Sequence, residues 1–481
     1  MVKYFLLIIS LVLSCLPLSA IDVEVSTYRF TGKTRYVEVY FRVTGNSVKW
    51  KSLDSVRQAS VQVVYYVKDK DEKILAWDKF ILNKSVTDSI VDFITVKRMA
   101  LPAGNYTLRV ETTDMNNTED KLEMEKILVL EPPSGGVILS DLMLLSALDK
   151  TDSEGEMVRG GYYMEPMAFS FAGPKVQALT LYQEVYRPQS DSAEYFVRIS
   201  LYEGFGIKDE KTPLMSKFRK LSVSTVEPLI LSLPVNSVRS GNYHVSVSII
   251  DKHKNVLSSC YADLVRSNPE ADIAYLENYN EDLENSFVRD LKGEDMDFIL
   301  KAHLPVTPQN QVSTLGELIS GKRLASQRQF VFQFWKNRYP ENPEAAYKKY
   351  MEVAQAVDRQ FQTNAGYGFQ SDRGHIFLKY GKPTNVLTID TEVDAPPYEI
   401  WYYYHMAATN QTNVRFLFYN PSLVHNDFRL LHSTCLGERT NPAWETELYK
   451  SVPRERLGNT VDATQVADNK NRNARRYFNE F

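Results

Sequence analysis

The N-terminal half of the chain alternates apolar and polar residues with a period of two, as half-buried β-strands do. Tyr36–Val43 and Ser60–Val67 show this alternation clearly. An internal repeat follows the same pattern, because Gly104–Asp114 aligns without gaps on Gly241–Asp251 and matches it at Gly, Asn, Tyr, Val and Asp. The alternation and the repeat together predict two related β-rich domains, over residues 21–131 and 137–266.

Tyr106 and Tyr243 occupy equivalent positions in the repeat, each after a Gly-Asn pair at the start of an alternating strand. A Gly-x-Tyr that leads into such a strand is typical of the tyrosine corner of immunoglobulin-like sandwiches, in which the phenol hydroxyl bonds back to the backbone. We therefore interpret both domains as immunoglobulin-like all-β sandwiches. Gly-Asn is also a common turn pair, so a chance match between two hairpins is the alternative.

The periodicity changes after the second β domain. Glu131–Gly136 is a Pro- and Gly-rich cluster typical of linkers, and it separates the two β domains. Beyond Arg266–Pro269, helices are predicted over 271–300, over 311–336 and from Asn342 to Phe361. Asn342 suits the helix cap, and the next residue, a proline, suits the first turn.

Four short strands are predicted after these helices, over 375–380, 399–405, 414–419 and 428–432. Helices followed by a meander of strands favour an α+β domain over 270–450, with helices packed on a small antiparallel sheet. The remaining residues, 451–481, are polar and basic and are expected to form a solvated tail.

The strand predicted over 399–405 is apolar on both faces. Ile400, Tyr402 and Tyr404 point one way, and Trp401 and Tyr403 point the other way with a histidine. Such a strand must be covered on both faces. We expect helices on one face and either a sandwich domain or a partner protein on the other. Trp401, Tyr403 and Tyr404 are therefore the candidate interaction surface, with docking inside the chain as the alternative.

The first twenty residues have the pattern of a secretion signal. Lys3 precedes the apolar run Tyr4–Leu13, and Leu18–Ala20 offers a small-residue cleavage site. The run is shorter than the ~20 residues that cross a bilayer, and no second such run follows, so no integral membrane span is predicted. We expect export and cleavage after Ala20. An uncleaved anchor and a lipoprotein attached through Cys15 are the alternatives.

Charge and cysteine content exclude several classes of partner. Loss of Lys3 with the signal takes the formal net charge from -4 to -5. So mild an acidity indicates neither nucleic acid nor an anionic membrane surface as a partner. About 460 mature residues fit two to four domains. Cys260 and Cys435 lie in different predicted domains, so no disulfide framework or cysteine metal site is expected, and a single bridge between domains is left open.

Five short motifs follow one another in the C-terminal half. They are Phe334–Pro340, Gly368–Gly374, Tyr380–Pro383, Tyr398–Tyr402, and Leu431–Ser433 with Gly437, Glu438 and Trp444. Their order resembles that of the GWxTD domain, a family of secreted proteins of Bacteroidota and related bacteria. The residues that stand in the namesake motif, Gly-Trp-x-Thr-Asp-Arg-Gly, are Gly368, Phe369, Ser371, Asp372, Arg373 and Gly374.

Phe369 replaces the tryptophan of that motif and Ser371 replaces its threonine, each with its chemical character kept. The family has no established activity. The resemblance therefore implies an architecture and a periplasmic or outer-membrane-associated location rather than a reaction.

The motif residues also have structural interpretations. Ser371–Gly374 suits a type I turn. Pro383 is expected to end a strand, because it cannot donate to the ladder. Trp335 and Trp401 are expected to anchor a hydrophobic core.

A catalytic interpretation needs the ionisable residues near the motifs to converge. These residues are Asp372, Arg373, His375, Glu399 and His432. Asp372 and His375 would then form an acid–base pair, and the chain would be a hydrolase or a glycan-binding enzyme. The competing interpretation is a simple ion pair between Asp372 and Arg373. We favour a non-enzymatic envelope protein whose sandwich modules present the α+β domain to another envelope protein.

No cofactor or metal is predicted. Gly316–Arg323 resembles a phosphate-binding loop, but Arg323 stands where a hydroxyl residue should hold magnesium, and the preceding residues predict a helix rather than a strand. The seven histidines show no metal-ligand spacing.

Bacteria of the implied group attach O-glycans at Asp-Ser or Asp-Thr followed by a small or aliphatic residue, and Ser55, Ser89 and Ser192 fit that pattern. We predict that protein isolated from its native host is heavier than the chain cleaved after Ala20. Intact-mass measurement checks this, and a mass equal to that of the cleaved chain removes the prediction.

Overall fold

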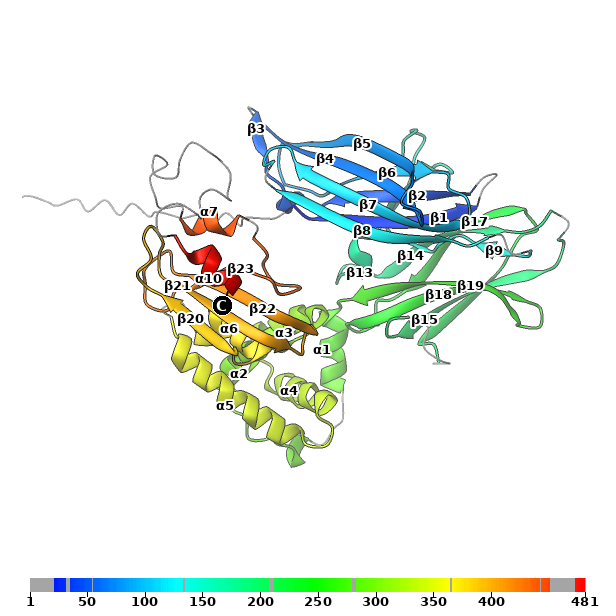
Figure 1. Ribbon diagram of the computed structural model, residues 1–481. Coiled ribbons are helices and arrows are strands. Elements are labelled where there is room, and N and C mark those ends of the chain that lie inside the picture. Colours follow the sequence, from blue (N-terminus) through cyan, green and yellow to red (C-terminus); the bar gives the residue numbers. More distant parts are fainter. Residues whose placement is uncertain are drawn as a thin grey trace, which may run out of the picture. The chain divides into compact units, whose positions relative to one another are not determined.

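The computed structural model describes residues 21–31, 35–53, 55–118, 120–132, 135–189, 191–206, 212–278, 283–363, 366–441, 443–449 and 472–480. The expected signal, with Cys15, and residues 451–471 of the expected tail lie outside this part. Strands fill the N-terminal region, helices follow, and a small antiparallel sheet comes last (Figure 1). The sequence pattern predicted this order.

The chain divides into two compact units. One unit comprises the residues up to Ser26 together with Tyr40–Lys97 and Ala103–Glu131. The other unit comprises Thr27–Val39, Arg98–Pro102 and the chain from Pro132 onward.

The first strands form two sheets. One has the order β1 (Val23–Thr31), β2 (Arg35–Val43), β6 (Phe93–Met99). The other has the order β3 (Lys51–Leu53), β4 (Val56–Asp69), β7 (Gly104–Asp114), β8 (Lys121–Leu130), and β5 (Ile74–Val86) also pairs with β4. Every second residue from Ala59 to Val67 is buried, which confirms the alternation that predicted a strand there.

The next strands form two more sheets. One has the order β11 (Val158–Arg159), β12 (Tyr162–Pro166), β10 (Met143–Lys150), β14 (Ala178–Tyr186), β17 (Val226–Pro234), and β9 (Ile138–Leu139) also pairs with β14. The other has the order β13 (Phe171–Ala172), β19 (Val256–Arg266), β18 (Gly241–Asp251), β15 (Tyr195–Glu203), β16 (Met215–Lys220). Both sheets contribute to one buried cluster, Leu181 and Leu231 from the first and Ile199 and Val247 from the second. The two sheets therefore pack face to face.

The two copies of the sequence repeat are strands β7 and β18. The Tyr243 hydroxyl donates to the Arg239 carbonyl oxygen at 2.9 Å, and burial raises the pKa of Tyr243 to about 12. A Cβ added at Gly241 would lie 3.1 Å from the Tyr243 hydroxyl oxygen, and one added at Gly104 would lie 2.9 Å from that of Tyr106. In both copies the tyrosine ring folds back over the glycine two residues before it.

The helical region holds several short helices. They are α1 (Pro269–Asn278), α2 (Met296–His303), α3 (Val312–Gly321), α4 (Leu324–Arg338), α5 (Pro343–Phe361) and α6 (Asp372–Tyr380), with a 3₁₀ turn η6 (Gly368–Gln370). Helix α5 begins as predicted, because the Asn342 side chain accepts the Ala345 amide proton at 3.1 Å. The helix predicted over 311–336 is instead two helices, because Lys322 adopts a left-handed conformation that ends α3. The helix predicted over 271–300 is likewise interrupted, by turns between Asn278 and Met296.

The last sheet has the order β20 (Asn385–Ile389), β21 (Tyr398–Met406), β22 (Gln411–Tyr419), β23 (Arg429–Ser433). Three of its strands were predicted. The prediction of a strand over 375–380 is wrong, because these residues belong to α6. The Ser371 hydroxyl caps this helix by accepting the Gly374 amide proton at 3.1 Å. The type I turn predicted at 371–374 is thus the start of a helix, and Pro383 follows that helix rather than ending a strand.

Helices cover both faces of this sheet. Trp401 and Tyr403 share a buried cluster with α5 and α6. Tyr398 and Ile400 share another cluster with α7 (Trp444–Leu448) and α10 (Ala474–Glu480) (Figure 1). The chain's own C-terminal helices therefore cover Tyr398 and Ile400 on the second face, where a sandwich domain or a partner was expected.

The described part of the tail, residues 472–480, is also less solvated than predicted. The Arg472 side chain is buried and pairs with Asp394 at 3.1 Å, and Arg475 pairs with Glu445 at 2.5 Å.

The two cysteines whose pairing the sequence left open, Cys260 and Cys435, are both free thiols. No helix in the described ranges is both long enough and apolar enough to cross a membrane.

The hydroxyl of Tyr243 gives a direct test of the corner. Tyr243→Phe should lower the free energy of unfolding by about 1 kcal/mol, because the hydrogen bond of the buried Tyr243 to the Arg239 carbonyl is lost. Denaturant unfolding measures this. Tyr261→Phe, at an exposed position on β19, is the control and should change stability by less than about 0.5 kcal/mol. Equal effects of the two substitutions on stability would contradict the interpretation of Tyr243 as a tyrosine corner.

Candidate functional site

The GWxTD-like motif lies where η6 joins α5 to α6. The Ser371 hydroxyl donates to the Gly368 carbonyl oxygen at 2.6 Å and also caps α6. The Gly368 amide donates to the Asp358 carboxylate at 2.6 Å. These bonds fix the short turn between the two helices at both of its ends.

Both motif glycines sit at close backbone contacts. A Cβ added at Gly368 would lie under 3.0 Å from the Asp358 carbonyl oxygen of α5. One added at Gly374 would lie under 3.0 Å from the Gly368 carbonyl oxygen. Real Cβ atoms essentially never come so close to backbone atoms, so only glycine fits at either position.

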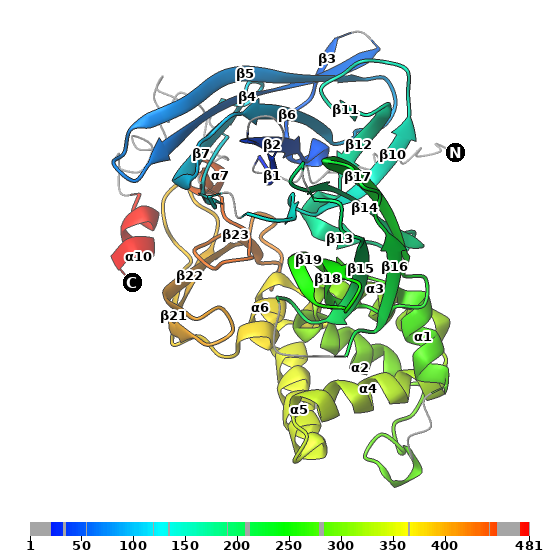
Figure 2. The same ribbon diagram turned by 90° about the vertical axis from the view of Figure 1, so that its right-hand side faces the viewer.

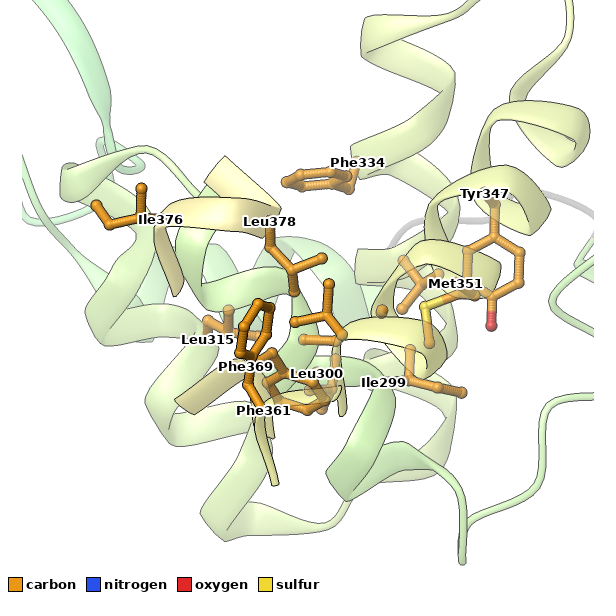
Figure 3. Close-up of a cluster of buried hydrophobic side chains, with 14 of the residues drawn as sticks. Ile299, Leu300, Leu315, Phe334, Tyr347, Met351, Phe361, Phe369, Ile376 and Leu378 are labelled. Atoms are coloured by element: carbon orange, nitrogen blue, oxygen red, sulfur yellow. The ribbon is translucent and has the colours of Figure 1, made fainter. Parts of the chain in front are cut away.

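Phe369 fills the core beneath this turn. It is 1% exposed and lies 5.1 Å from the Phe298 ring and 5.2 Å from the Tyr367 ring, centroid to centroid. Figure 3 shows it among buried side chains that include Phe361 and Leu300. The aromatic position of the motif is thus a packing position.

The charged motif residues bind other parts of the domain. An Asp372 carboxylate oxygen accepts the Leu430 amide proton at 2.7 Å, which ties α6 to β23. Arg373 donates to Glu399 at 2.8 Å, and the other Glu399 oxygen accepts the Trp401 indole N–H at 2.9 Å. Burial lowers the pKa of Arg373, and Glu399 opposes that shift. Arg373 therefore pairs with the sheet, in place of the predicted pair with Asp372.

The Arg373 guanidinium also contacts the β22–β23 connection. It donates to the Asn426 side-chain oxygen at 3.0 Å and lies 4.0 Å from the centroid of the Phe428 ring. This one side chain thus fixes both β21 and the loop before β23 to the start of α6.

The two histidines of the predicted catalytic set lie apart. Burial lowers the pKa of His375, Lys379 adds to the shift, and Glu438 and Asp372 oppose it. His432 instead lies against Trp444 and Phe478 on the other face of the sheet, with ring centroids 6.1 and 5.2 Å away. Its Nδ1 accepts the Asn441 amide proton at 3.0 Å, and burial lowers its pKa to about 4.

The five predicted residues consequently form no single site. Asp372, Arg373 and Glu399 are held in bonds between α6 and the sheet, and His432 is on the opposite face. No hydrogen bond between the Asp372 carboxylate and the His375 ring occurs within the described residues. Asp372 is close enough to His375 to oppose the lowering of its pKa, so the acid–base pair considered from the sequence stays a prediction.

The candidate interaction surface is mostly interior. Trp401 is 2% exposed and Tyr403 is 3% exposed, whereas Tyr404 is 65% exposed. The Trp401 ring lies 5.8 Å from that of Phe361 on α5, and the Tyr403 hydroxyl donates to the Gly381 carbonyl at 2.9 Å. The expected surface is therefore corrected: α5 and α6 cover Trp401 and Tyr403, and Tyr404 alone of the three faces solvent.

A polar cluster that the sequence did not indicate lies at the end of α6. One Glu438 oxygen accepts from the Lys379 ammonium at 2.6 Å and from the Tyr380 hydroxyl at 2.7 Å. Cys435 is buried beside it, and burial raises the pKa of this thiol. A buried thiol with a raised pKa is a poor nucleophile, so the cluster holds α6 to the sheet.

The described residues contain no group of three His, Cys, Asp or Glu side chains placed to hold a metal ion. The segment with a phosphate-loop resemblance, Gly316–Gly321, is helical and belongs to α3.

A known protein family matches the region around this motif. Residues 302–447 match the GWxTD domain family. The GWxTD match runs from α2 to α7 and so contains α3 to α6 and all four strands of the last sheet, but neither α1 nor α10. The β-rich region lies outside it.

No curated protein matches the chain. Among solved structures, a red sea bream transglutaminase is 9% identical, with a TM-score of 0.17, over 51% of this chain and 31% of that one. The ApaA protein of Bordetella pertussis is 13% identical, with a TM-score of 0.17, over 24% of this chain and 94% of that one. At these scores neither likeness carries an argument about fold or activity.

The close contact at Gly374 predicts a steric penalty. Gly374→Ala should lower the free energy of unfolding by about 3 kcal/mol, because the new methyl group forces η6 away from α6. Gly316→Ala is the matched control. It lies inside helix α3 with open space around it, so it should raise stability by about 0.5–1 kcal/mol. Denaturant unfolding compares the two, and a Gly374→Ala protein as stable as the control would contradict the contact.

A buried histidine in the GWxTD region predicts a pH dependence. His303 Nε2 accepts the Trp335 indole N–H at 2.9 Å, and Nδ1 donates to the Ile299 carbonyl at 2.6 Å. The ring is therefore neutral. Burial lowers its pKa to about 4 from the ordinary value of 6.5.

Because the folded-state pKa lies below the unfolded one, the unfolded chain binds more protons between pH 6.5 and 4. The stability from His303 is complete above about pH 6.5 and is lost as pH falls, with about 2 kcal/mol gone by pH 5. Denaturant unfolding at several pH values measures the slope of the free energy of unfolding against pH. His303→Gln should show a shallower slope, with a residual part from His432, whereas unchanged slopes would contradict the assignment.

Proposed function

We propose that this chain is a non-enzymatic protein of the bacterial cell envelope, in which two β modules present the GWxTD-like α+β domain to another envelope protein. One observation carries the proposal: Asp372, Arg373 and Glu399 are all engaged in bonds that hold the domain together. Arg373 is buried, Glu399 is half-buried, and the exposed Asp372 binds through one of its carboxylate oxygens. Charged groups engaged in this way hold a fold together.

The structural features of the two β modules support a role as spacers. The second module has two sheets that share one core, and a tyrosine bonded to the backbone four residues earlier. The repeated segment in the first module has the same tyrosine folded over a glycine. These features favour immunoglobulin-like sandwiches for both modules.

The envelope location rests on the secretion pattern of residues 1–20 and on the GWxTD resemblance. The protein would be periplasmic or associated with the outer membrane in a member of the Bacteroidota or a related group. Anchoring through Cys15 is the alternative to cleavage after Ala20. Ser55, Ser89 and Ser192 are all exposed, as O-glycosylation of these residues requires.

The alternative of a hydrolase or glycan-binding enzyme needs Asp372 and His375 to act as an acid–base pair. One Asp372 oxygen already accepts the Leu430 amide proton, and no hydrogen bond joins Asp372 to the His375 ring among the described residues. The geometry therefore favours binding.

The test is identification of the partner in the native host. A chain tagged after its last residue, with its signal intact, is crosslinked, gently solubilised and analysed by mass spectrometry. We expect one stoichiometric envelope protein. Asp372→Asn should retain it, because an asparagine oxygen still accepts the Leu430 amide proton. A clean monomer, together with a hydrolytic activity that Asp372→Asn removes, would overturn the proposal.

A further inference from the structure

A surface groove lies between α1 and α3, outside the motif. Its volume is about 490 Å³, within the range of ligand-binding sites. The two helices run side by side in both views (Figures 1 and 2). The groove is lined by Glu270, Ile273, Ala274, Glu277, Glu317, Leu318, Ser320, Gly321 and Arg323.

The walls of the groove are fixed in place. On α1, one Asp272 carboxylate oxygen accepts the Thr314 hydroxyl proton of α3 at 2.5 Å, and the other accepts the Ser240 amide proton at 2.8 Å. Ile273 and the buried Leu318 form an apolar floor. The groove therefore exists without an occupant and needs no rearrangement to form.

Its rim is acidic. Glu270 and Glu277 on α1 face Glu317 on α3, and the single basic lining residue, Arg323, pairs with Glu277. Within the described residues, neither Glu270 nor Glu317 forms an ion pair. Helix α3 ends at Gly321, in the lining, so the negative end of its dipole adds to the field.

The one ion pair at the rim is replaceable. The Arg323 side chain is 64% exposed and that of Glu277 is 42% exposed, and exposed pairs contribute little stability because water and salt screen them. An incoming cation can take the place of Arg323 at Glu277 without unfolding any element.

We propose that this groove binds a basic segment of the partner protein, with an arginine or lysine as its anchor. The aliphatic stem of the anchor lies on Ile273 and Leu318, and its charged head lies between Glu270 and Glu317. The inference rests on the proposed function and names the surface that performs it.

The length of the groove fits a peptide better than a small amine. On α1 the lining runs from Glu270 to Glu277, about 10 Å of helix, which equals about three residues of extended chain. The carboxylates on both walls disfavour an anionic occupant such as nucleic acid or an acidic lipid.

The test uses a fluorescein-labelled heptapeptide, Gly-Leu-Arg-Leu-Arg-Leu-Gly, titrated with the full chain by fluorescence anisotropy. Glu270→Gln and Glu317→Gln should each weaken binding about fivefold, and Arg323→Gln should tighten it about threefold, because Glu277 is then free. The controls are Glu352→Gln on α5, exposed and outside the groove, and Arg289→Gln, an exposed arginine whose pairs also lie outside it. Both should leave the affinity unchanged.

If the rim and control substitutions change the peptide affinity equally, the groove is not the binding site, and only a general effect of charge remains. Spermidine that competes as tightly as the peptide would also overturn it, in favour of a small-cation site.

The two proposals fail separately. A native partner that co-purifies equally with the wild-type chain and with the Glu270→Gln/Glu317→Gln double variant would overturn the groove and leave the proposed function standing. Peptide binding that depends on the rim, with no partner recovered from the native host, would overturn the envelope-partner function and leave the groove as a site for basic peptides.

Discussion

The backbone contact between η6 and its two neighbouring helices is the constraint on which the C-terminal domain depends. Gly368 lies against the last turns of α5, and Gly374 lies against Gly368, in both cases with no room for a Cβ atom. This closeness brings Ser371 to the cap of α6 and aims Asp372 and Arg373 at the sheet. A side chain at either glycine would separate the helices and break those bonds together.

The motif therefore acts as a joint between helices and sheet. Asp372 holds β23 through a backbone amide, and Arg373 holds β21 through Glu399, which in turn orients the Trp401 indole. A buried charge with such partners contributes to the specificity of a fold. The Arg373 and Glu399 side chains are thus directed inward, and the binding that we propose lies elsewhere, in the acidic groove between α1 and α3.

The sequence predicted local structure wherever the signal was local. The alternation of β4, the Asn342 cap and the aromatic strand β21 were all legible, because period and capping depend on neighbouring residues. The error at 375–380 arose because a capping serine and a turn-forming serine look alike without the contact at Gly374. The site was beyond prediction for a related reason: the pairing of Arg373 with Glu399, and the burial of Trp401, depend on tertiary packing across the sheet.

A double-mutant cycle between Arg373 and Glu399 tests the structural role of the motif most directly. The free energy of unfolding is measured for the wild type, Arg373→Met, Glu399→Gln and the double variant. Each single variant should lose about 3 kcal/mol, and the double variant should lose less than their sum, with a coupling of about 2 kcal/mol. Single variants as stable as the wild type, with a coupling near zero, would contradict this structural role and return these charges to a functional one.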